Sequence, residues 1–251
     1  MAEVLAFLAH CEKADPSLHL AISTSLSLIS GALHLFAQPR ELCLSFNGGK
    51  DCTVVLHLLR AALHRASAPP LGSPGGPGVV YFRGAEPEFP EVAAFIAATE
   101  AAFGFSCETF GGFKSGLAAL VARPEGGGRL RGVLMGTRAS DPAGAFLCGP
   151  FSPTTPGWPP VMRVNPILGW SYAQVWAFLR GVPLPFCELY ARGFTSLGAP
   201  SDSARNPRLA APPGSGGAGW RPAWELDDGA LEREGRGAAS AAHAEQQKIE
   251  C

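Results

Sequence analysis

Residues 42–59 constrain the fold of this chain more than any other stretch. Residues 42–46, Leu-Cys-Leu-Ser-Phe, form an apolar run that predicts a short buried strand. Residues 47–49, Asn-Gly-Gly, predict a turn, and apolar residues then recur at helical spacing over residues 50–59. A strand, a glycine turn and a helix in this order bring free backbone N–H groups and the positive end of a helix together beside Lys50. The stretch therefore predicts a binding site for an anion such as a phosphate.

Two familiar phosphate-binding patterns do not describe this loop. A Walker A loop has four residues between its first glycine and Gly-Lys-Ser/Thr, and residues 48–51, Gly-Gly-Lys-Asp, lack that spacing. The dinucleotide pattern G-x-G-x-x-G does not occur in this stretch either. The loop therefore indicates a different class of phosphate site.

The bulk composition indicates a globular chain without general affinity for polyanions. The 251 residues suit one α/β domain, or at most two small ones, and 47% of them are hydrophobic against 16% charged. A net charge of −1 gives no overall attraction to nucleic acid or to an acidic membrane surface. We find no run of 18 apolar residues and no secretory signal, so we expect no membrane span.

The cysteines predict a reducing compartment. Seven are scattered through the chain without a C-x-x-C pair, which argues against a zinc ribbon or a redox dithiol. Because an odd, scattered set without a signal peptide is typical of reducing compartments, we expect a cytoplasmic protein. Cys52 lies near the predicted start of a helix, where a thiol is either a buried structural group or a reactive one.

Strand and helix alternate four times over residues 42–137. This alternation predicts an α/β fold with a doubly wound, mostly parallel sheet, flanking helices and a loop-rich C-terminal extension. Ligands of such sheets bind at the carboxyl ends of the strands. The predicted strands are 42–46, 78–83, 105–109 and 130–135, and the predicted helices between them are 50–65, 90–103 and 114–122. The predicted parts of the chain are a helical segment (1–40), a core (41–207), a flexible loop (208–219), an arginine motif (220–237) and a disordered tail (238–251).

The loop of residues 45–52, Ser-Phe-Asn-Gly-Gly-Lys-Asp-Cys, resembles the pyrophosphate-binding loop of the adenine-nucleotide α-hydrolase superfamily, also called the PP-loop superfamily. Further segments resemble, in the same order, the eukaryotic FAD synthase family, whose domain is similar to phosphoadenylyl-sulfate (PAPS) reductase. They are Gly136-Thr137-Arg138, Ser140-Asp141-Pro142, Phe151-Ser152-Pro153-Thr154, Gly157-Trp158-Pro159, Met162-Arg163-Val164-Asn165-Pro166, Tyr190, Arg192-Gly193-Phe194-Thr195-Ser196-Leu197-Gly198, Asn206-Pro207, Trp220-Arg221-Pro222-Ala223-Trp224 and Leu231-Glu232-Arg233-Glu234-Gly235-Arg236.

The resemblance implies an FMN adenylyltransferase, which converts FMN and ATP into FAD and pyrophosphate with Mg²⁺ as cofactor. The FMN phosphate is already anionic at pH 7, so catalysis reduces to positioning and charge neutralisation. The implied catalytic residues are Asn47, Lys50, Arg233 and Arg236. The expected ATP contacts are Ser45, Phe46, Asn47, Gly48, Gly49, Lys50, Asp51, Gly136 and Arg138, with Arg83 added because it ends a predicted strand. The expected FMN contacts are Asp141, Thr155, Trp158, Arg163, Arg221, Arg233 and Arg236.

Several roles remain open at this stage. Asp51 either caps the helix or helps to hold Mg²⁺, and Asp141 is a metal or flavin-side candidate or else part of an Asp-Pro turn. Arg233 and Arg236 share a face if they lie on a helical turn, which suits a phosphate group, whereas the alternative is a solvated pair. Trp158 either walls the flavin ring or serves packing alone.

Two positions depart from the family pattern. Ala139 stands where a second arginine is usual, and Thr155 stands where an aspartate that contacts the flavin is expected. Both bear on FMN binding rather than on the ATP loop, because a hydroxyl can hydrogen-bond a flavin edge but carries no charge. The resemblance also implies the synthase module alone, without the molybdopterin-binding-like N-terminal domain of many animal versions.

Two other functions compete with this interpretation. One is another enzyme of the same fold, such as a PAPS reductase-like or a tRNA-thiolating enzyme, although Cys251 lacks the neighbours that a reductase needs. The other is a non-catalytic protein that binds FAD and delivers it to apo-flavoproteins. Formation of FAD from FMN, ATP and Mg²⁺ distinguishes these functions.

Overall fold

A single six-stranded sheet forms the centre of the computed structural model, which describes residues 2–124, 129–142, 144–212 and 219–237. The strand order is β3-β2-β1-β4-β6-β5. The strands are β1 (Leu42–Ser45), β2 (Gly78–Arg83), β3 (Cys107–Gly111), β4 (Gly132–Leu134), β5 (Phe151–Pro153) and β6 (Met162–Val164). All neighbouring strands are parallel except β5, which pairs antiparallel with β6. The predicted mostly parallel sheet is therefore confirmed.

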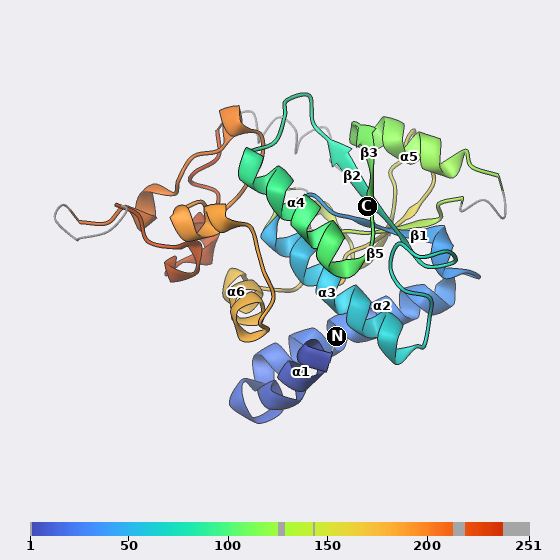
Figure 1. Cartoon of the computed structure of the whole chain (residues 1–251), viewed down its shortest axis with the longest axis horizontal. Coiled ribbons are helices and arrows are strands. Elements are labelled where there is room, and N and C mark those ends of the chain that lie inside the picture. Colours follow the sequence, from blue (N-terminus) through green and yellow to red (C-terminus); the bar gives the residue numbers. More distant parts are fainter. Residues whose placement is uncertain (1, 125–128, 143, 213–218, 238–251) are drawn as a thin grey trace.

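Helices cover both faces of this sheet (Figure 1). The helices are α1 (Ala2–Ala14), α2 (Pro16–Leu35), α3 (Lys50–Arg65), α4 (Pro90–Phe103), α5 (Phe113–Val121) and α6 (Tyr172–Gly181). One core joins α2, α3, α4 and α6 to one face, where Leu44 is fully buried. A smaller core joins α5 to the opposite face, where Cys43 and Val133 are buried. The alternation along β1 and the helices on both faces confirm the doubly wound class.

Local sequence signals set several helix boundaries. The Asp15 carboxylate accepts the N–H of Leu18 at 3.0 Å, and Pro16 occupies the first turn of α2. Ser171 and Gln174 form a capping box at the start of α6. Gly104 ends α4 with a φ of +70°, a conformation that favours glycine.

Two details of the sheet differ from the sequence prediction. Strand β3 begins at Cys107 rather than at 105. Phe105 directly follows Gly104, the C-cap residue of α4, and its ring packs against Phe46 with 6.3 Å between the centroids. Strand β5 was predicted as loop. It has three residues and ends in a proline, so it carries no periodic signal, and Pro153 is tolerated because the strand lies at the edge of the sheet.

Helix α2 is an exception to the expectation that no segment could span a membrane. By length and composition alone it could cross a bilayer, with a mean hydropathy of 1.4. One such helix is weak evidence, because a core helix passes the same test. Here Ile22 and Ile29 are completely buried, and the Ser25 hydroxyl donates to the carbonyl of Pro166 at 2.7 Å. These contacts are those of a core helix.

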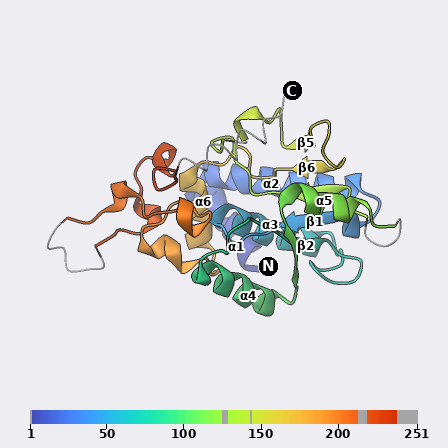
Figure 2. The same cartoon turned by 90° about the horizontal axis from the view of Figure 1, so that it is seen from above.

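The chain after α6 forms a lobe at one end of the molecule (orange to red in Figures 1 and 2). It consists mainly of single 3₁₀ turns. Isolated bridges pair Ser203 with Arg236 and Ala210 with Trp220, so residues 220–236 fold back onto the preceding part of the lobe. Residues 213–218 of the predicted flexible loop and the predicted tail, 238–251, lie outside the described residues.

Candidate active site

The glycine loop between β1 and α3 has a shape that depends on glycine. Gly48 has a φ of +73°, and a Cβ atom there would lie 3.1 Å from Ile96 and 3.2 Å from Val92 of α4. Gly49 is the N-cap of α3, and no side chain caps that helix end. The loop thus lies at the carboxyl end of β1 with the positive end of α3 behind it, as predicted for an anion site.

Two side chains hold the loop in this conformation. The Asn47 Oδ1 atom accepts the backbone N–H of Gly49 and the thiol of Cys52, each at 3.0 Å. The hydroxyl of Tyr190, which comes from the C-terminal lobe, accepts the backbone N–H of Lys50 at 2.8 Å. Asn47 therefore shapes the turn from within, while Tyr190 fixes the start of α3 from outside.

A buried network of charged groups lies directly beside the loop. The Lys50 Nζ atom is 2.9 Å from Asp51 Oδ2 and 3.1 Å from Glu232 Oε2. The Arg138 guanidinium donates from Nε to Asp51 Oδ1 at 2.8 Å and from Nη2 to Glu232 Oε1. Arg138 is only 1% exposed and Glu232 only 3%. Four charged groups of alternating sign thus form a closed ring, which we call the charge ring: Lys50, Asp51, Arg138 and Glu232.

Asp141 joins this network at its edge. Its Oδ2 atom accepts the backbone N–H of Arg138 at 2.8 Å, and its Oδ1 atom lies 4.0 Å from the Arg138 guanidinium. Burial and the nearby Asp51 carboxylate raise the pKa of Asp141. Burial would also raise the pKa of Asp51, but Lys50 and Arg138 outweigh it and lower that pKa. The two aspartates therefore differ in electrostatic environment. Ionisation of Asp51 is favoured by Lys50 and Arg138, whereas ionisation of Asp141 is disfavoured by burial and by Asp51.

The raised pKa of Asp141 predicts a stability effect with a definite sign. Asp141→Asn should raise the melting temperature at pH 7, because the amide keeps an oxygen for the Arg138 N–H but carries no charge. A raised folded-state pKa disfavours folding above the unfolded value and has no effect below it. The gain should therefore vanish below about pH 3.8, where the carboxyl is protonated in both states. Thermal unfolding between pH 3 and pH 8 tests this prediction, and a variant with a lower melting temperature at pH 7 would contradict it.

The predicted ATP-side residues differ in what they can offer a ligand. Phe46 is completely buried and packs on Phe95 and Phe105, so only its backbone is near the loop. Arg83, at the end of β2, is half-exposed and pairs with Glu88 at 3.2 Å. A Cβ atom at Gly136 would lie 2.6 Å from the backbone nitrogen of Cys52, so the segment after β4 closely approaches the first turn of α3. Ser45, Gly48, Gly49 and Lys50 lie on the loop itself.

The predicted FMN-side residues do not form one cluster of contacts. Trp158 lies 5.9 Å from the ring of Phe113 and 5.4 Å from the Lys114 ammonium, at the edge of the smaller core. The carbonyl of Thr155 accepts the N–H of Trp158 at 3.0 Å, so Thr155 shapes the turn that carries this ring. Arg163 donates to the carbonyls of Ser152 and Pro153, across β5.

Arg233 interacts electrostatically with the network, whereas Arg236 is bound within the C-terminal lobe, and the two do not lie on a helix. Residues 232–235 form a hydrogen-bonded turn, in which the Arg236 N–H donates to the Arg233 carbonyl at 2.8 Å. Arg236 is bound by Asp202 at 2.6 Å, by Ser196 and by the Leu197 carbonyl. Burial and the charge of Arg236 lower the pKa of Arg233, while Asp141 and Glu232 oppose this shift.

Arg221 has contact partners that differ from those of Arg233 and Arg236. It donates to the carbonyls of Arg208 and Glu225, within the lobe. The pKa of Arg233 is affected by two charges of the network, those of Asp141 and Glu232.

Sequence reasoning missed two residues of the site. Glu232 lies inside a quoted segment, but a glutamate between arginines in a polar segment resembles a solvated residue. Tyr190 belongs to the segments that resemble the family, but it was given no role in the site. No charge imbalance pointed to Glu232, because the predicted Asp51 and Asp141 already matched the charges of Lys50 and Arg138.

The thiol of Cys52 is structural. It donates to Asn47 Oδ1 and to the Gly49 carbonyl, and burial raises its pKa to about 12. A thiol with this pKa is protonated at pH 7 and is not a nucleophile. This excludes a reactive role for the cysteine nearest to the loop.

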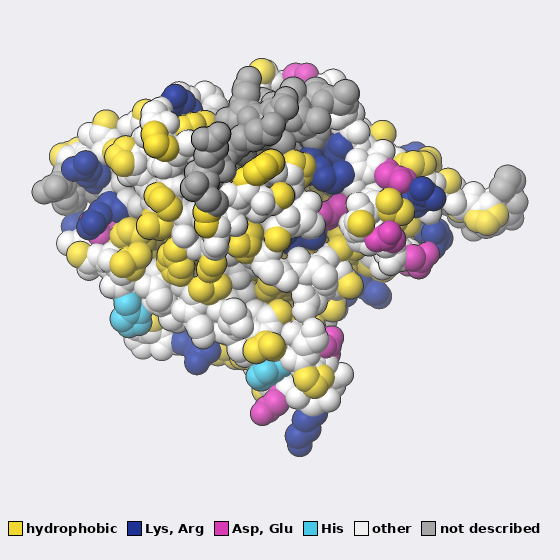
Figure 3. Space-filling view, turned by 180° about the vertical axis from the view of Figure 1, so that it is seen from behind, with side chains coloured by type: hydrophobic (Ala, Val, Ile, Leu, Met, Phe, Trp, Pro, Cys, Tyr) yellow, Lys and Arg dark blue, Asp and Glu magenta, His cyan; other side chains and the backbone are white. Residues whose placement is uncertain are grey.

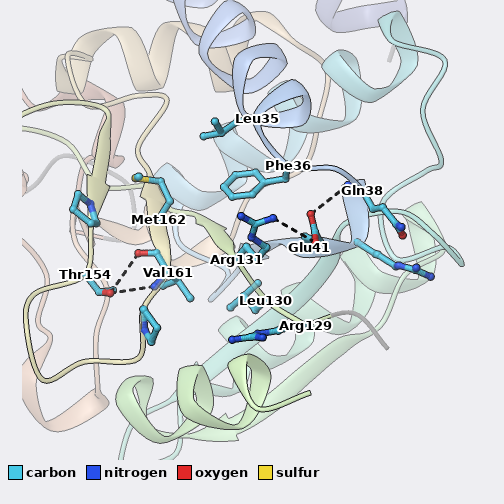
Figure 4. Close-up of a pocket in the computed structure, with 13 residues that line it drawn as sticks. Leu35, Phe36, Gln38, Glu41, Arg129, Leu130, Arg131, Thr154, Val161 and Met162 are labelled. Carbon is cyan, nitrogen blue, oxygen red and sulfur yellow. Dashed lines mark hydrogen bonds and ion pairs between the residues drawn. The ribbon is translucent and has the colours of Figure 1, made fainter. Parts of the chain in front are cut away.

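A groove of about 930 Å³ lies at the opposite, amino-terminal end of β1 and β4 (Figure 4). Arg129, Arg131 and Glu41 line it together with Phe36 and Met162. The Arg131 guanidinium is directed toward Glu41, at 3.8 Å, so part of its charge is already balanced. None of the predicted site residues lines the groove. On the face in Figure 3, the described basic side chains are interspersed with acidic ones.

The fold and the loop together define the PP-loop class of α/β protein: an open, mostly parallel sheet with a glycine turn at its carboxyl edge and two buried cations beside it. The family model for the phosphoadenosine phosphosulfate reductase domain matches residues 41–117 and 128–204. The chain belongs to this family and, within it, to the FAD synthase group, as the relatives below indicate.

A probable FAD synthase of Caenorhabditis elegans is 40% identical over 195 residues, which make up 77% of this chain and 36% of that protein. One of Schizosaccharomyces pombe is 34% identical over 221 residues, or 86% of this chain and 78% of that protein. The structure of Candida glabrata FMN adenylyltransferase in complex with FMN and the ATP analogue AMPCPP superposes with a TM-score of 0.80 at 24% identity, over 94% of both chains. The chain thus spans about a third of the length of its Caenorhabditis relative.

Proposed function

We propose that this chain is an FMN adenylyltransferase, which transfers AMP from ATP to the phosphate of FMN and releases pyrophosphate. The observation that carries the proposal is the glycine loop with Lys50 and Arg138 beside it, in a chain 34% identical to a probable FAD synthase that it covers over most of its length. The names of the relatives and the ligands of the Candida glabrata enzyme support the same reaction.

The chemistry matches what the site can do. An oxygen of the FMN phosphate attacks the α-phosphorus of ATP, and the bond from that phosphorus to the bridging oxygen of the β-phosphate breaks. The nucleophile carries its charge already, so no general base is needed, and the leaving pyrophosphate takes the electron pair. The loop N–H groups, the start of α3 and the positive charge of Lys50 oppose the negative charge that builds on the phosphates.

Mg²⁺ fits two of the residues present. Asp51 and Asp141 are carboxylates close enough for one to raise the pKa of the other. Mg²⁺ is usually bound by one or two carboxylates together with substrate phosphates and water. Among the described residues, no group of three or more candidate ligands forms a ready metal site, so the phosphates would complete the coordination. The ion would supply charge neutralisation on the polyphosphate.

A second candidate is a non-catalytic protein that binds FAD and delivers it to apo-flavoproteins. Thr155 and Ala139 favour it, because both replace charged residues of the family pattern on the flavin side. We also propose a cytoplasmic location, supported by the scattered spacing of the cysteines without a C-x-x-C pair.

One incubation tests the proposed reaction. The purified chain with FMN, ATP and Mg²⁺ should form FAD and pyrophosphate in equal amounts, which chromatography and a pyrophosphate assay measure. AMPCPP in place of ATP should give no FAD, because a methylene group replaces the oxygen of the bond that must break. Tight FAD binding without turnover would overturn the proposed enzymatic activity and support the function of a delivery protein.

Asn47→Ala should lower the rate of FAD formation at least tenfold. The variant loses both hydrogen bonds that orient Gly49 and Cys52, so the loop N–H groups no longer converge on the phosphates. Ser73→Ala is the matched control, since the Ser73 hydroxyl also closes a local turn, to the Pro70 carbonyl, but away from the site. A rate for Asn47→Ala within about threefold of the wild type, below roughly 1 kcal/mol, would remove this role.

A further inference from the structure

Glu232 occupies an unusual place for a carboxylate of the C-terminal lobe. It lies outside the residues that the family model matches, yet its side chain is 3% exposed and contacts both cations beside the loop. Its Oε2 atom is 3.1 Å from Lys50 Nζ, and its Oε1 atom accepts from Arg138 Nη2. One residue of the lobe thus joins the first turn of α3 to the segment after β4.

The backbone around Glu232 is fixed by buried polar groups. The Thr195 hydroxyl donates to the Glu232 carbonyl at 2.6 Å, and the Asn206 amide donates to the Leu231 carbonyl at 2.9 Å. Asn206 also donates to Thr195 at 3.0 Å, so these contacts form one network. Because both side chains are completely buried, this network holds the Glu232 side chain toward the loop.

The charges of the site explain what such a carboxylate does. Lys50 and Arg138 share Asp51 on one side of the charge ring and Glu232 on the other. Each cation therefore has two carboxylate partners, which fixes the spacing between the ammonium and the guanidinium. With Asp141, three carboxylates surround Lys50 and Arg138.

We propose that Glu232 is a positioning residue of the phosphate site, which acts through Lys50 and Arg138. It holds the two cations at a fixed spacing, and it reduces the positive charge that they present to the polyphosphate of ATP. This inference rests on the proposed function, because it assigns a role in that same site. The lobe thereby becomes part of the ATP site rather than only a part of the flavin side.

Glu232→Gln separates the two parts of this role. The amide keeps the length of the side chain but removes one negative charge, so ATP should bind more tightly and its KM should fall at least threefold. Lys50 and Arg138 lose a shared partner and are less well fixed, so kcat should fall at least tenfold. A lower KM together with a lower kcat is distinctive, because partial unfolding lowers kcat alone and a damaged binding site raises KM. The KM for FMN should stay within twofold.

Glu232→Asp and Glu234→Gln complete the test. The aspartate keeps the charge but is too short to reach both cations, so the KM for ATP should stay within twofold while kcat falls. Glu234, two residues away, pairs with Arg208 at the surface and should leave both constants unchanged when replaced by Gln. An ATP KM that is unchanged or raised in Glu232→Gln overturns the proposal, as does a wild-type kcat in Glu232→Asp. If Glu232→Gln does not fold, the aspartate variant decides.

Binding of AMPCPP keeps this inference separate from the proposed function. Calorimetry with the wild type and Glu232→Gln measures affinity without any reaction. An at least threefold tighter Kd in the variant supports the role of Glu232 even if the wild type forms no FAD, which would overturn the proposed function alone. An unchanged or weaker Kd overturns the positioning role.

Discussion

Arg138→Met is expected to lower the free energy of unfolding by about 3–5 kcal/mol, because it leaves Lys50 as the one cation of the charge ring, against the carboxylates of Asp51 and Glu232. Arg138 is fully buried, and its guanidinium is the partner of Asp51 and of Glu232. Methionine fills much of the space but cannot balance the two charges. For a chain of this size the melting temperature should fall by roughly 6–20 °C. Urea unfolding followed by circular dichroism measures the loss.

Arg192→Met is the matched control for this loss. Arg192 also pairs with two carboxylates, Glu91 at 2.9 Å and Glu188 at 2.8 Å, but its side chain is 47% exposed. Exposed ion pairs contribute little, so this variant should lose less than about 1 kcal/mol. Equal losses in the two variants would show that burial does not decide the energy of these pairs.

The loss of stability in Arg138→Met should also depend on pH. The pKa of Asp51 is lowered in the folded protein, so its stabilising contribution is present above the unfolded value near 3.8 and is lost as the pH falls through the folded value. The difference in stability between the wild type and Arg138→Met should therefore narrow below about pH 4.

Gly136→Ala is expected to weaken both the stability and the activity of the protein. The added Cβ atom would lie 2.6 Å from the Cys52 nitrogen and 2.7 Å from the Asp51 carbonyl carbon, so the first turn of α3 must move. Overpacking of this kind costs about 1–3 kcal/mol. Because the same turn carries Lys50, FAD formation should fall at least about tenfold, which corresponds to about 1.4 kcal/mol in the barrier. Melting temperatures and the rate of FAD formation measure the two effects.

Gly169→Ala is the control for this substitution. Gly169 is exposed, and a Cβ atom there meets nothing within 4 Å. Neither Gly169 nor Gly136 has a φ in the left-handed region, so the two variants differ in steric contact rather than in backbone strain. A wild-type rate of FAD formation in Gly136→Ala would contradict the close approach of this segment to α3.

Local patterns were enough to predict the central part of the fold. The apolar run of β1, the glycines and the helical spacing of α3 act over a few residues, so the strand, the loop and the helix were all predicted within one or two residues. Parallel pairing of β1, β2, β3 and β4 followed from the alternation of elements. By contrast, β5 is defined by its pairing with β6, which no local signal of three residues can encode.

The charge ring could be predicted only in part. Lys50, Asp51 and Arg138 lie in segments that predicted a phosphate site, but their mutual pairing depends on how β4 and α3 approach each other. Glu232 could not be distinguished from the exposed Glu234, because both lie among arginines in the same polar segment. Burial separates them, and burial depends on Thr195 and Asn206 far back in the chain.

The order of the charge ring along the chain determines when it can form during synthesis. Lys50 and Asp51 are made early, Arg138 follows, and Glu232 comes near the end of the described residues. At the usual rate of translation, Glu232 is added roughly 10–40 s after Lys50. A nascent chain thus has a glycine loop and its lysine long before it has the carboxylate that completes the ring. Only a chain that has been made as far as Glu232 can therefore hold both cations in their final positions.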